Sequence, residues 1–168
     1  MSAAEAQRFR ALILPHLDAA YGFARYLTRD ASRAEDIVQD AFLKALRGFA
    51  GFRGGEPRAW LFAIVRTTFL DAARGRPAWS DPQAAEAVPS EDDSPEDALV
   101  RQGEIATVRA AIEALPEPFR ETLVLRELEE LSYRQIAEVT SAPIGTVMSR
   151  LARARQMLLA ALSEEKRP

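Results

Sequence analysis

The sequence has no cysteine, no asparagine and a single histidine among its 168 residues. Without cysteine the chain cannot form disulfides, thiolate metal sites or a thiol nucleophile. The one imidazole, that of His16, follows Pro15 at an expected helix start, where a surface or capping role is the ordinary interpretation. We therefore expect neither a metal ion nor any other cofactor.

Catalytic patterns and long apolar runs are missing as well. The chain has no glycine-rich phosphate loop, no pair of histidines and no nucleophile with a base in reach, which indicates a protein that is not an enzyme. Glu5, Arg8 and Arg10 interrupt the region where a signal peptide needs an apolar core. No stretch approaches the ~20 apolar residues of a membrane span. We expect a cytoplasmic protein without membrane insertion.

Apolar residues recur at helical spacing, and no segment alternates with a period of two for long enough to predict a strand. The chain is therefore predicted to be all-α. Ser32 and Glu35 have the spacing of a capping box that would begin a helix running to about Arg47. Pro57 is well placed to begin the next helix, which should end near Arg74.

Helical spacing stops between Gly75 and Pro95, where proline, alanine and acidic residues replace large apolar ones. Such a segment cannot bury enough surface to order itself. We predict two small helical domains, residues 4–74 and 96–168, joined by a flexible acidic linker at 75–95. Helices are expected at 96–115 and 119–129 in the second domain.

The net charge of −3 is an average over segments of opposite charge. Residues 81–104 contain eight acidic residues and one arginine, whereas residues 52–76 contain five arginines and two acidic residues. Residues 132–168 are again net positive. Because salt screens charges beyond about 8 Å, each segment acts through its own charge. An acidic total therefore does not exclude binding to nucleic acid.

The most informative segment is 132–158, whose spacing is that of a helix-turn-helix. Ser132 and Gln135 form a capping box for a short first helix, and Ser141-Ala142-Pro143 forces a tight break. The second helix should run from Ile144 to about Leu159. Its inward stripe falls within roughly 60° of the helix circumference and consists of Val147, Leu151, Ala154 and Leu158.

The other side of this second helix is small, neutral or basic. No acidic residue occurs between Ile144 and Ala161. Its outer face would contact base edges and its flanks would contact phosphates, as a recognition helix does in a major groove. The outer face contains Ser149, Ala152, Arg153 and Gln156; Arg150 and Arg155 lie on its flanks, and Thr146 lies near its start.

Four runs in this order resemble the extracytoplasmic-function sigma factors of bacteria. The runs are AEDIVQDAFLKALRGF at 34–49, RAWLFAIVR at 58–66, LPEPFRETLVLRELEELSYRQIA at 115–137 and PIGTVMSRLARAR at 143–155. The resemblance covers nearly the whole chain. It implies that residues 4–74 are region 2, which docks on the clamp helices of RNA polymerase and opens the −10 element. Residues 96–168 would be region 4, which binds the −35 element.

The resemblance also implies roles for individual residues. The polymerase-binding residues would be Asp36, Gln39 and Asp40. The −10 surface would consist of Arg53, Arg58, Arg66, Thr67, Asp71 and Arg74, with possible stacking on Phe49, Phe52, Trp60, Phe62 or Phe69. The −35 contacts would come from Arg134, Thr146, Met148, Ser149, Arg150, Ala152, Arg153 and Arg155. The expected partners are core RNA polymerase, promoter DNA and an anti-sigma factor.

Two positions depart from the family pattern. Thr67 stands where the family usually has asparagine, and a hydroxyl cannot make the two-point contact of an amide. Met148 stands at a commonly basic position, which removes one possible phosphate or guanine contact and should weaken the salt-dependent part of binding. Both changes bear on DNA preference.

Two alternatives to a sigma factor remain open at this stage. One is a sigma-mimicking adaptor whose helices bind an anti-sigma factor and not DNA. A mimic would have no reason to keep Arg150, Arg153 and Arg155 around a neutral face, and the chain has no room for the receiver domain that mimics usually carry. The other is an unrecognised small helical enzyme, for which no catalytic motif speaks.

Overall fold

The computed structural model describes residues 1–75 and 95–165, with only the backbone of residues 95–98. Every regular element in these ranges is helical, as the sequence predicts. The first half contains α1 (Ala3–Leu12), α2 (Leu17–Thr28), α3 (Ala31–Gly48) and α4 (Pro57–Gly75), with the short 3-10 turns Leu14–His16 and Phe49–Gly51. The second half contains α5 (Pro95–Glu113), α6 (Glu117–Leu123), the π-helical turn η3 (Val124–Leu128), α7 (Tyr133–Thr140) and α8 (Ile144–Glu165).

In the first half, α2, α3 and α4 pack on one another around buried aromatic and alanine side chains. Phe23 of α2 and Phe62 of α4 are fully buried, with ring centroids 5.3 Å apart. Ala34, Ala41 and Ala45 line the inner side of α3, where their small side chains allow the helices to approach closely.

The start of α3 corrects the predicted capping box of Ser32 and Glu35. The N-cap is Asp30, whose carboxylate accepts hydrogen bonds from the backbone N–H groups of Ser32 and Arg33 at 2.9 and 3.2 Å. Asp30 has an extended backbone, and the preceding Arg29 is left-handed (φ 58°). The chain therefore turns before Asp30, which leaves Ser32 inside the first turn.

In the second half, the capping box of Ser132 and Gln135 is confirmed. The segment predicted as one helix at 119–129 is instead α6 followed by η3. Backbone N–H of Glu129 donates to the carbonyl of Val124, five residues back, at 3.1 Å, which is the wider spacing of a π-helix. α8 continues to Glu165, beyond the predicted end near Leu159.

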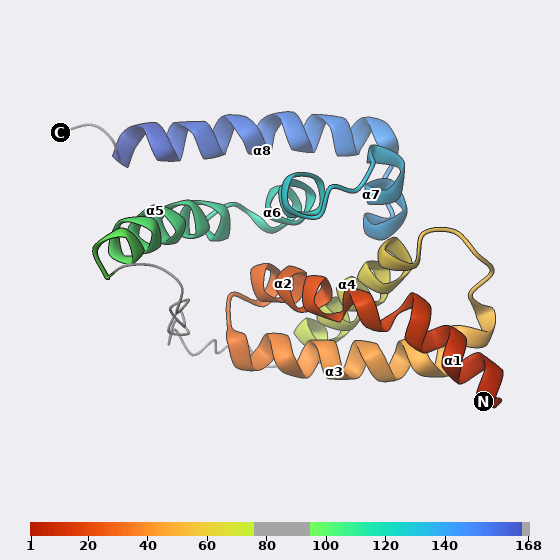
Figure 1. The fold of residues 1–168 in the computed structure, drawn as a ribbon. Coiled ribbons are helices and arrows are strands. Elements are labelled where there is room, and N and C mark those ends of the chain that lie inside the picture. The colour runs from red at the N-terminus through yellow and green to blue at the C-terminus, as the bar shows by residue number, and fades with distance from the viewer. Residues whose placement is uncertain (76–94, 166–168) are drawn as a thin grey trace.

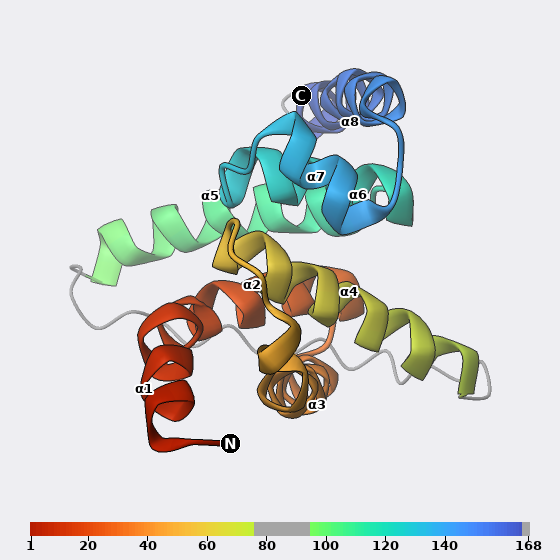
Figure 2. The same cartoon turned by 90° about the vertical axis from the view of Figure 1, so that its right-hand side faces the viewer.

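The two halves pack against each other, with α2 and α4 facing α6 and α7 (Figures 1 and 2). α8 and α3 lie at opposite outer sides of the molecule. Buried apolar side chains from both halves form one continuous cluster. The predicted acidic linker at 75–95 lies outside the described residues except for Gly75 and Pro95. None of the described helices is both long and apolar enough to cross a bilayer.

Candidate nucleic-acid interface

The helices α7 and α8 form the helix-turn-helix that the sequence predicts. α7 ends at Thr140, and its C-cap Ser141 has a left-handed backbone (φ 53°); α8 begins three residues after this cap. Val147, Leu151 and Ala154 are buried against the rest of this half, which turns the other side of α8 to solvent. The exposed predicted −35 residues are Arg134, Met148, Ser149, Ala152, Arg153 and Arg155, and the half-buried ones are Thr146 and Arg150.

The arginines of α8 differ in their electrostatic surroundings. Nε and Nη2 of Arg155 both donate to Oε1 of Glu127, at 2.8 and 2.5 Å. The bonded Glu127 carboxylate holds the pKa of Arg155 above its ordinary value. Arg150 and Arg153 form no ion pair with any other residue that the structure describes. Arg155 is therefore the one of these three arginines with a carboxylate partner among the described residues, and both side chains of the pair are 47% exposed. Sequence reasoning missed Glu127 because it lies 28 residues away.

Four of the six predicted −10 residues are open to solvent, one in the loop before α4 and three in the last turns of that helix. Arg53, Thr67, Asp71 and Arg74 are exposed. The hydroxyl of Thr67 donates to the carbonyl of Ala63 at 2.9 Å, so its proton is used within the helix. This bond leaves the Thr67 oxygen as an acceptor toward any outside donor.

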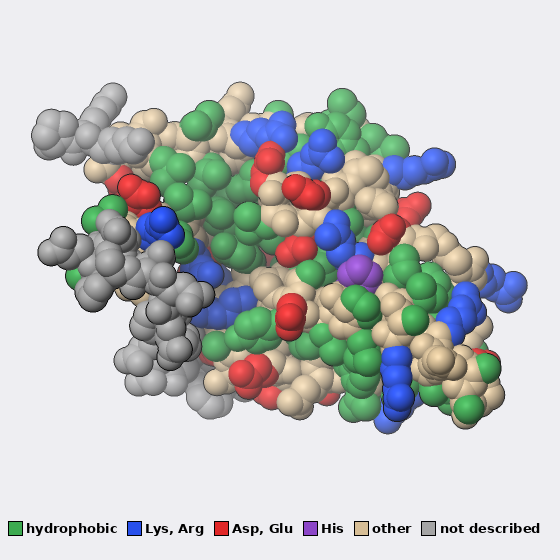
Figure 3. Space-filling view, viewed as in Figure 1, with side chains coloured by type: hydrophobic (Ala, Val, Ile, Leu, Met, Phe, Trp, Pro, Cys, Tyr) green, Lys and Arg blue, Asp and Glu red, His purple; other side chains and the backbone are tan. Residues whose placement is uncertain are grey.

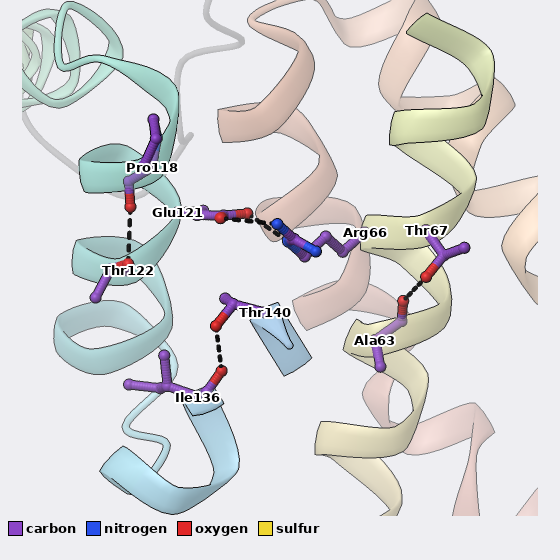
Figure 4. A network of polar contacts seen from close by, with 8 residues as sticks. All are labelled: Ala63, Arg66, Thr67, Pro118, Glu121, Thr122, Ile136 and Thr140. Atoms are coloured by element: carbon purple, nitrogen blue, oxygen red, sulfur yellow. Dashed lines mark hydrogen bonds and ion pairs between the residues drawn. The ribbon is translucent and has the colours of Figure 1, made fainter. Parts of the chain in front are cut away.

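The other two predicted −10 residues, Arg58 and Arg66, face the second half instead of solvent. Arg66 forms a two-point ion pair with Glu121 of α6, Nε to Oε2 at 2.8 Å and Nη2 to Oε1 at 3.2 Å (Figure 4). The side chains are 19% and 5% exposed. Nη2 of Arg58 donates to the backbone carbonyl of Glu129. The six residues therefore do not form one open surface in this arrangement.

Glu129 lies close to both α4 and α2, and this position affects the pKa of its carboxyl. A Cβ built on Gly22 of α2 would lie 3.9 Å from Oε1 of Glu129, so the carboxylate lies close to that helix. Burial raises the pKa of the Glu129 carboxyl, and the Arg58 guanidinium opposes this effect. The contact between the halves thus includes one paired buried acid, Glu121, and one partly desolvated acid.

The aromatic side chains considered as stacking platforms belong mainly to the core. Phe49, Phe52, Phe62 and Phe69 are buried, so none of these four rings is open to a base in this arrangement. Phe49 and Phe52 also stack on each other and pack against the half-buried Trp60. These rings stabilise the loop that leads into α4.

The predicted polymerase-binding residues lie together on the solvent side of α3. Asp36, Gln39 and Asp40 are all exposed, while Ile37 of the same helix is buried. Leu43 continues this side one turn further and is 46% exposed. Sequence reasoning missed Leu43, although its spacing of three from Asp40 and seven from Asp36 places it on the same side. The surface is therefore acidic with an apolar end.

A second apolar surface gathers between α8 and α5 on the side shown in Figure 3. Within the described part of α5, the large apolar side chains that are exposed are Leu99, Val100, Ile105 and Val108. Across the described ranges, no group of three or more histidine, aspartate or glutamate side chains is arranged to hold a metal ion.

Comparisons with known proteins place both halves in one family. Sigma-70 region 2 matches residues 12–77, and Sigma-70, region 4, matches residues 105–158. The RNA polymerase sigma-H factor of Pseudomonas aeruginosa is 41% identical over 165 residues, which cover 92% of this chain and 86% of that protein. The ECF RNA polymerase sigma-E factor of Escherichia coli is 39% identical over 134 residues, which cover 73% and 70% of the two chains.

A solved structure agrees with these relatives. The sigma factor RpoE of Bartonella quintana, crystallised in complex with the anti-sigma factor NepR, superposes with a TM-score of 0.77 at 28% identity, covering 94% of this chain and 98% of that one. The family is one of transcription initiation factors and not of enzymes. The chain belongs to the extracytoplasmic-function group of the sigma-70 family of RNA polymerase sigma factors.

Proposed function

We propose that this chain binds core RNA polymerase in the cytoplasm and directs it to promoters with a −35 and a −10 element. The observation that carries the proposal is α8, a recognition helix with a buried apolar stripe and an exposed surface of small, neutral and basic residues. The proposed domains are residues 4–74 and 96–168, with 75–95 as their linker.

Within the second domain, α8 enters the major groove of the −35 element. Arg153 is unpaired by any described residue and lies on the outer face, so its planar guanidinium can donate to guanine O6 and N7. Arg134 and Arg150 contact phosphates, which sets the register of the helix without specifying sequence.

Within the first domain, α4 and the loop before it hold the melted −10 strand. Cationic groups track the strand backbone while a pocket accepts a base turned out of the stack. Arg53 and Arg74 are open for this task, whereas Arg58 and Arg66 are bound to Glu129 and Glu121 of the other half. We therefore propose that the halves separate before the −10 element is bound.

On α3, the exposed side that carries Asp36, Gln39, Asp40 and Leu43 contacts the polymerase clamp helices. We further propose control by an anti-sigma factor. Two solved relatives support this: RpoE is in complex with NepR, and CnrH is in complex with the cytosolic domain of CnrY.

A gel shift separates this proposal from the sigma-mimicking adaptor. Labelled promoter DNA is mixed with core polymerase, with the chain, or with both. A sigma factor produces a sequence-specific shift only when both are present. An adaptor binds a purified anti-sigma factor but adds no sequence-specific shift to core polymerase, and that result would overturn the proposal.

A further inference from the structure

Two large apolar side chains on α8 are exposed in its first two turns. Ile144 is 45% exposed and Met148, four residues later, is 53% exposed. Their spacing places them one above the other along the helix. The apolar residues that face inward, Val147 and Leu151, are each 1% exposed. Ile144 and Met148 are therefore not part of the core of this half.

The edge of α8 that carries these two side chains has little free charge. Arg155 follows Met148 by seven residues, so it lies within about 20° of it around the helix. The charge of Arg155 is compensated by Glu127 through bonds of 2.8 and 2.5 Å. Arg153 lies about 140° around the helix from Met148. The recognition helix thus has an apolar edge and a separate cationic side.

In the major groove, thymine differs from the other bases by its O4 acceptor and its C5-methyl group. Methionine has no donor for O4, but its flexible thioether chain can cover a methyl group closely. Residues in the first turns of a recognition helix contact base edges. We propose that Met148, with Ile144 beside it, recognises thymine methyl groups in the −35 element. This inference rests on the proposed −35 binding by α8.

The helix α8 would then recognise two bases by two different kinds of contact. Arg153 selects guanine through hydrogen bonds, and the Met148 edge selects thymine by removing its methyl group from water. Burial of a methyl group does not release counterions, so the preference for the methyl group should not depend on salt. The overall affinity for the promoter should still fall with salt.

Replacement of thymine by deoxyuracil tests this directly, because it removes the methyl group and nothing else. A promoter is first selected from random duplexes with the holoenzyme, and each thymine on either strand of its −35 element is then replaced in turn. At about 0.8 kcal/mol per buried methyl group, we expect about a fourfold loss of holoenzyme affinity at one or two positions. The same ratio is expected at low and high salt.

Variants connect the effect to the side chain. Met148→Ala should abolish the discrimination between thymine and uracil at its position, and Met148→Leu should keep most of it. Leu159→Ala is the matched control, because Leu159 is an exposed apolar residue of the same helix about three turns further on. It should leave the discrimination unchanged. Circular dichroism verifies that each variant keeps its helical content.

Three results would overturn the inference: a selected −35 element without thymine, a holoenzyme indifferent to every replacement, or discrimination that persists undiminished in Met148→Ala. The failure of the proposed function looks different, because the holoenzyme would then select no promoter at all.

Discussion

Arg153 and Arg155 are two residues apart on α8, but only Arg155 has a carboxylate partner among the residues that the structure describes. Arg153→Ala should change which −35 sequences are preferred, since a good bidentate contact to guanine contributes about 1–3 kcal/mol of discrimination. Arg155→Ala should reduce affinity for all sequences alike and only slightly. Binding measured against a panel of −35 variants distinguishes the two; an even loss across the panel for Arg153→Ala would contradict its assignment to a base.

Glu127, the ion-pair partner of Arg155, provides a second test of how Arg155 affects DNA binding. Glu127→Gln removes the negative charge that compensates Arg155, which frees a cation beside the DNA. Each added phosphate contact steepens the dependence of log affinity on log salt by about 0.9. We expect a steeper slope for Glu127→Gln than for the unaltered chain when holoenzyme binding is titrated with salt. An unchanged slope would mean that Arg155 lies away from the phosphates.

Glu129 should make stability depend on pH in a particular direction. Burial raises the pKa of its carboxyl in the folded state. The Glu129 carboxyl therefore loses its proton less readily in the folded protein than in the unfolded chain. Its contribution to the free energy of unfolding falls as the pH rises from the ordinary carboxyl pKa through the raised pKa of the folded state. Glu129→Gln cannot ionise and avoids this loss. Urea unfolding should show the variant gaining stability relative to the unaltered chain between about pH 4 and pH 7; an equal difference at both pH values would contradict the account.

The helix α3 combines a buried alanine-rich side with an exposed acidic side. Asp36→Lys together with Asp40→Lys should abolish assembly with core polymerase while the helical content stays unchanged, because both carboxylates are exposed and neither caps the helix. Size-exclusion chromatography of the mixture measures assembly.

The matched control for this pair is Glu164→Lys with Glu165→Lys at the end of α8, which changes the net charge equally at two exposed positions. The control should assemble normally. If the α3 variant assembles as well as the control, the polymerase contact lies elsewhere. Leu43→Ala should weaken assembly without abolishing it, since it removes only the apolar end of the surface.

The sequence predicts a helix start or a buried helix side well where a few residues at fixed spacing determine it. The capping box of Ser132 and Gln135 and the inward stripe of α8 follow directly from spacing. The predicted start of α3 is wrong because Asp30, in extended backbone after a left-handed Arg29, provides the cap two residues before Ser32. The π-helical turn after α6 has no signature in helical periodicity, since it inserts one residue into an otherwise regular pattern.

The contact between the two halves of the chain cannot be predicted from residue spacing. Arg66 and Glu121 are 55 residues apart and belong to different domains, yet they form the ion pair that joins α4 to α6. From the sequence alone, Arg66 is expected on an open DNA surface. A charged residue is usually exposed, so the burial of Glu121 and the partial burial of Arg66 become visible only when the two halves are placed together.

The ion pair gives a prediction about the arrangement of the halves. Glu121→Gln leaves Arg66 without its counter-charge in a mostly buried site, which disfavours the closed arrangement. Because the chain has no cysteine, Ser32→Cys and Ser163→Cys introduce two unique labelling sites on exposed residues of α3 and α8. Energy transfer between the labels should fall in Glu121→Gln.

Single-stranded −10 DNA provides the second measurement for this prediction. Glu121→Gln should bind it more tightly, because Arg58 and Arg66 become available, whereas Arg66→Ala should open the halves but bind it less well. The double variant Arg66→Glu with Glu121→Arg should restore energy transfer. If Glu121→Gln leaves both energy transfer and −10 binding unchanged, the contact does not limit access to α4.

Run-off transcription from a library of promoter sequences, with core polymerase and this chain as the only sigma factor, measures whether the chain directs polymerase to promoters. We expect transcripts from templates that share a −35 and a −10 element, with a different −35 preference when Arg153→Ala replaces the unaltered chain. Transcription that never exceeds core polymerase alone, or transcripts from templates with no shared −35 element, would contradict this expectation.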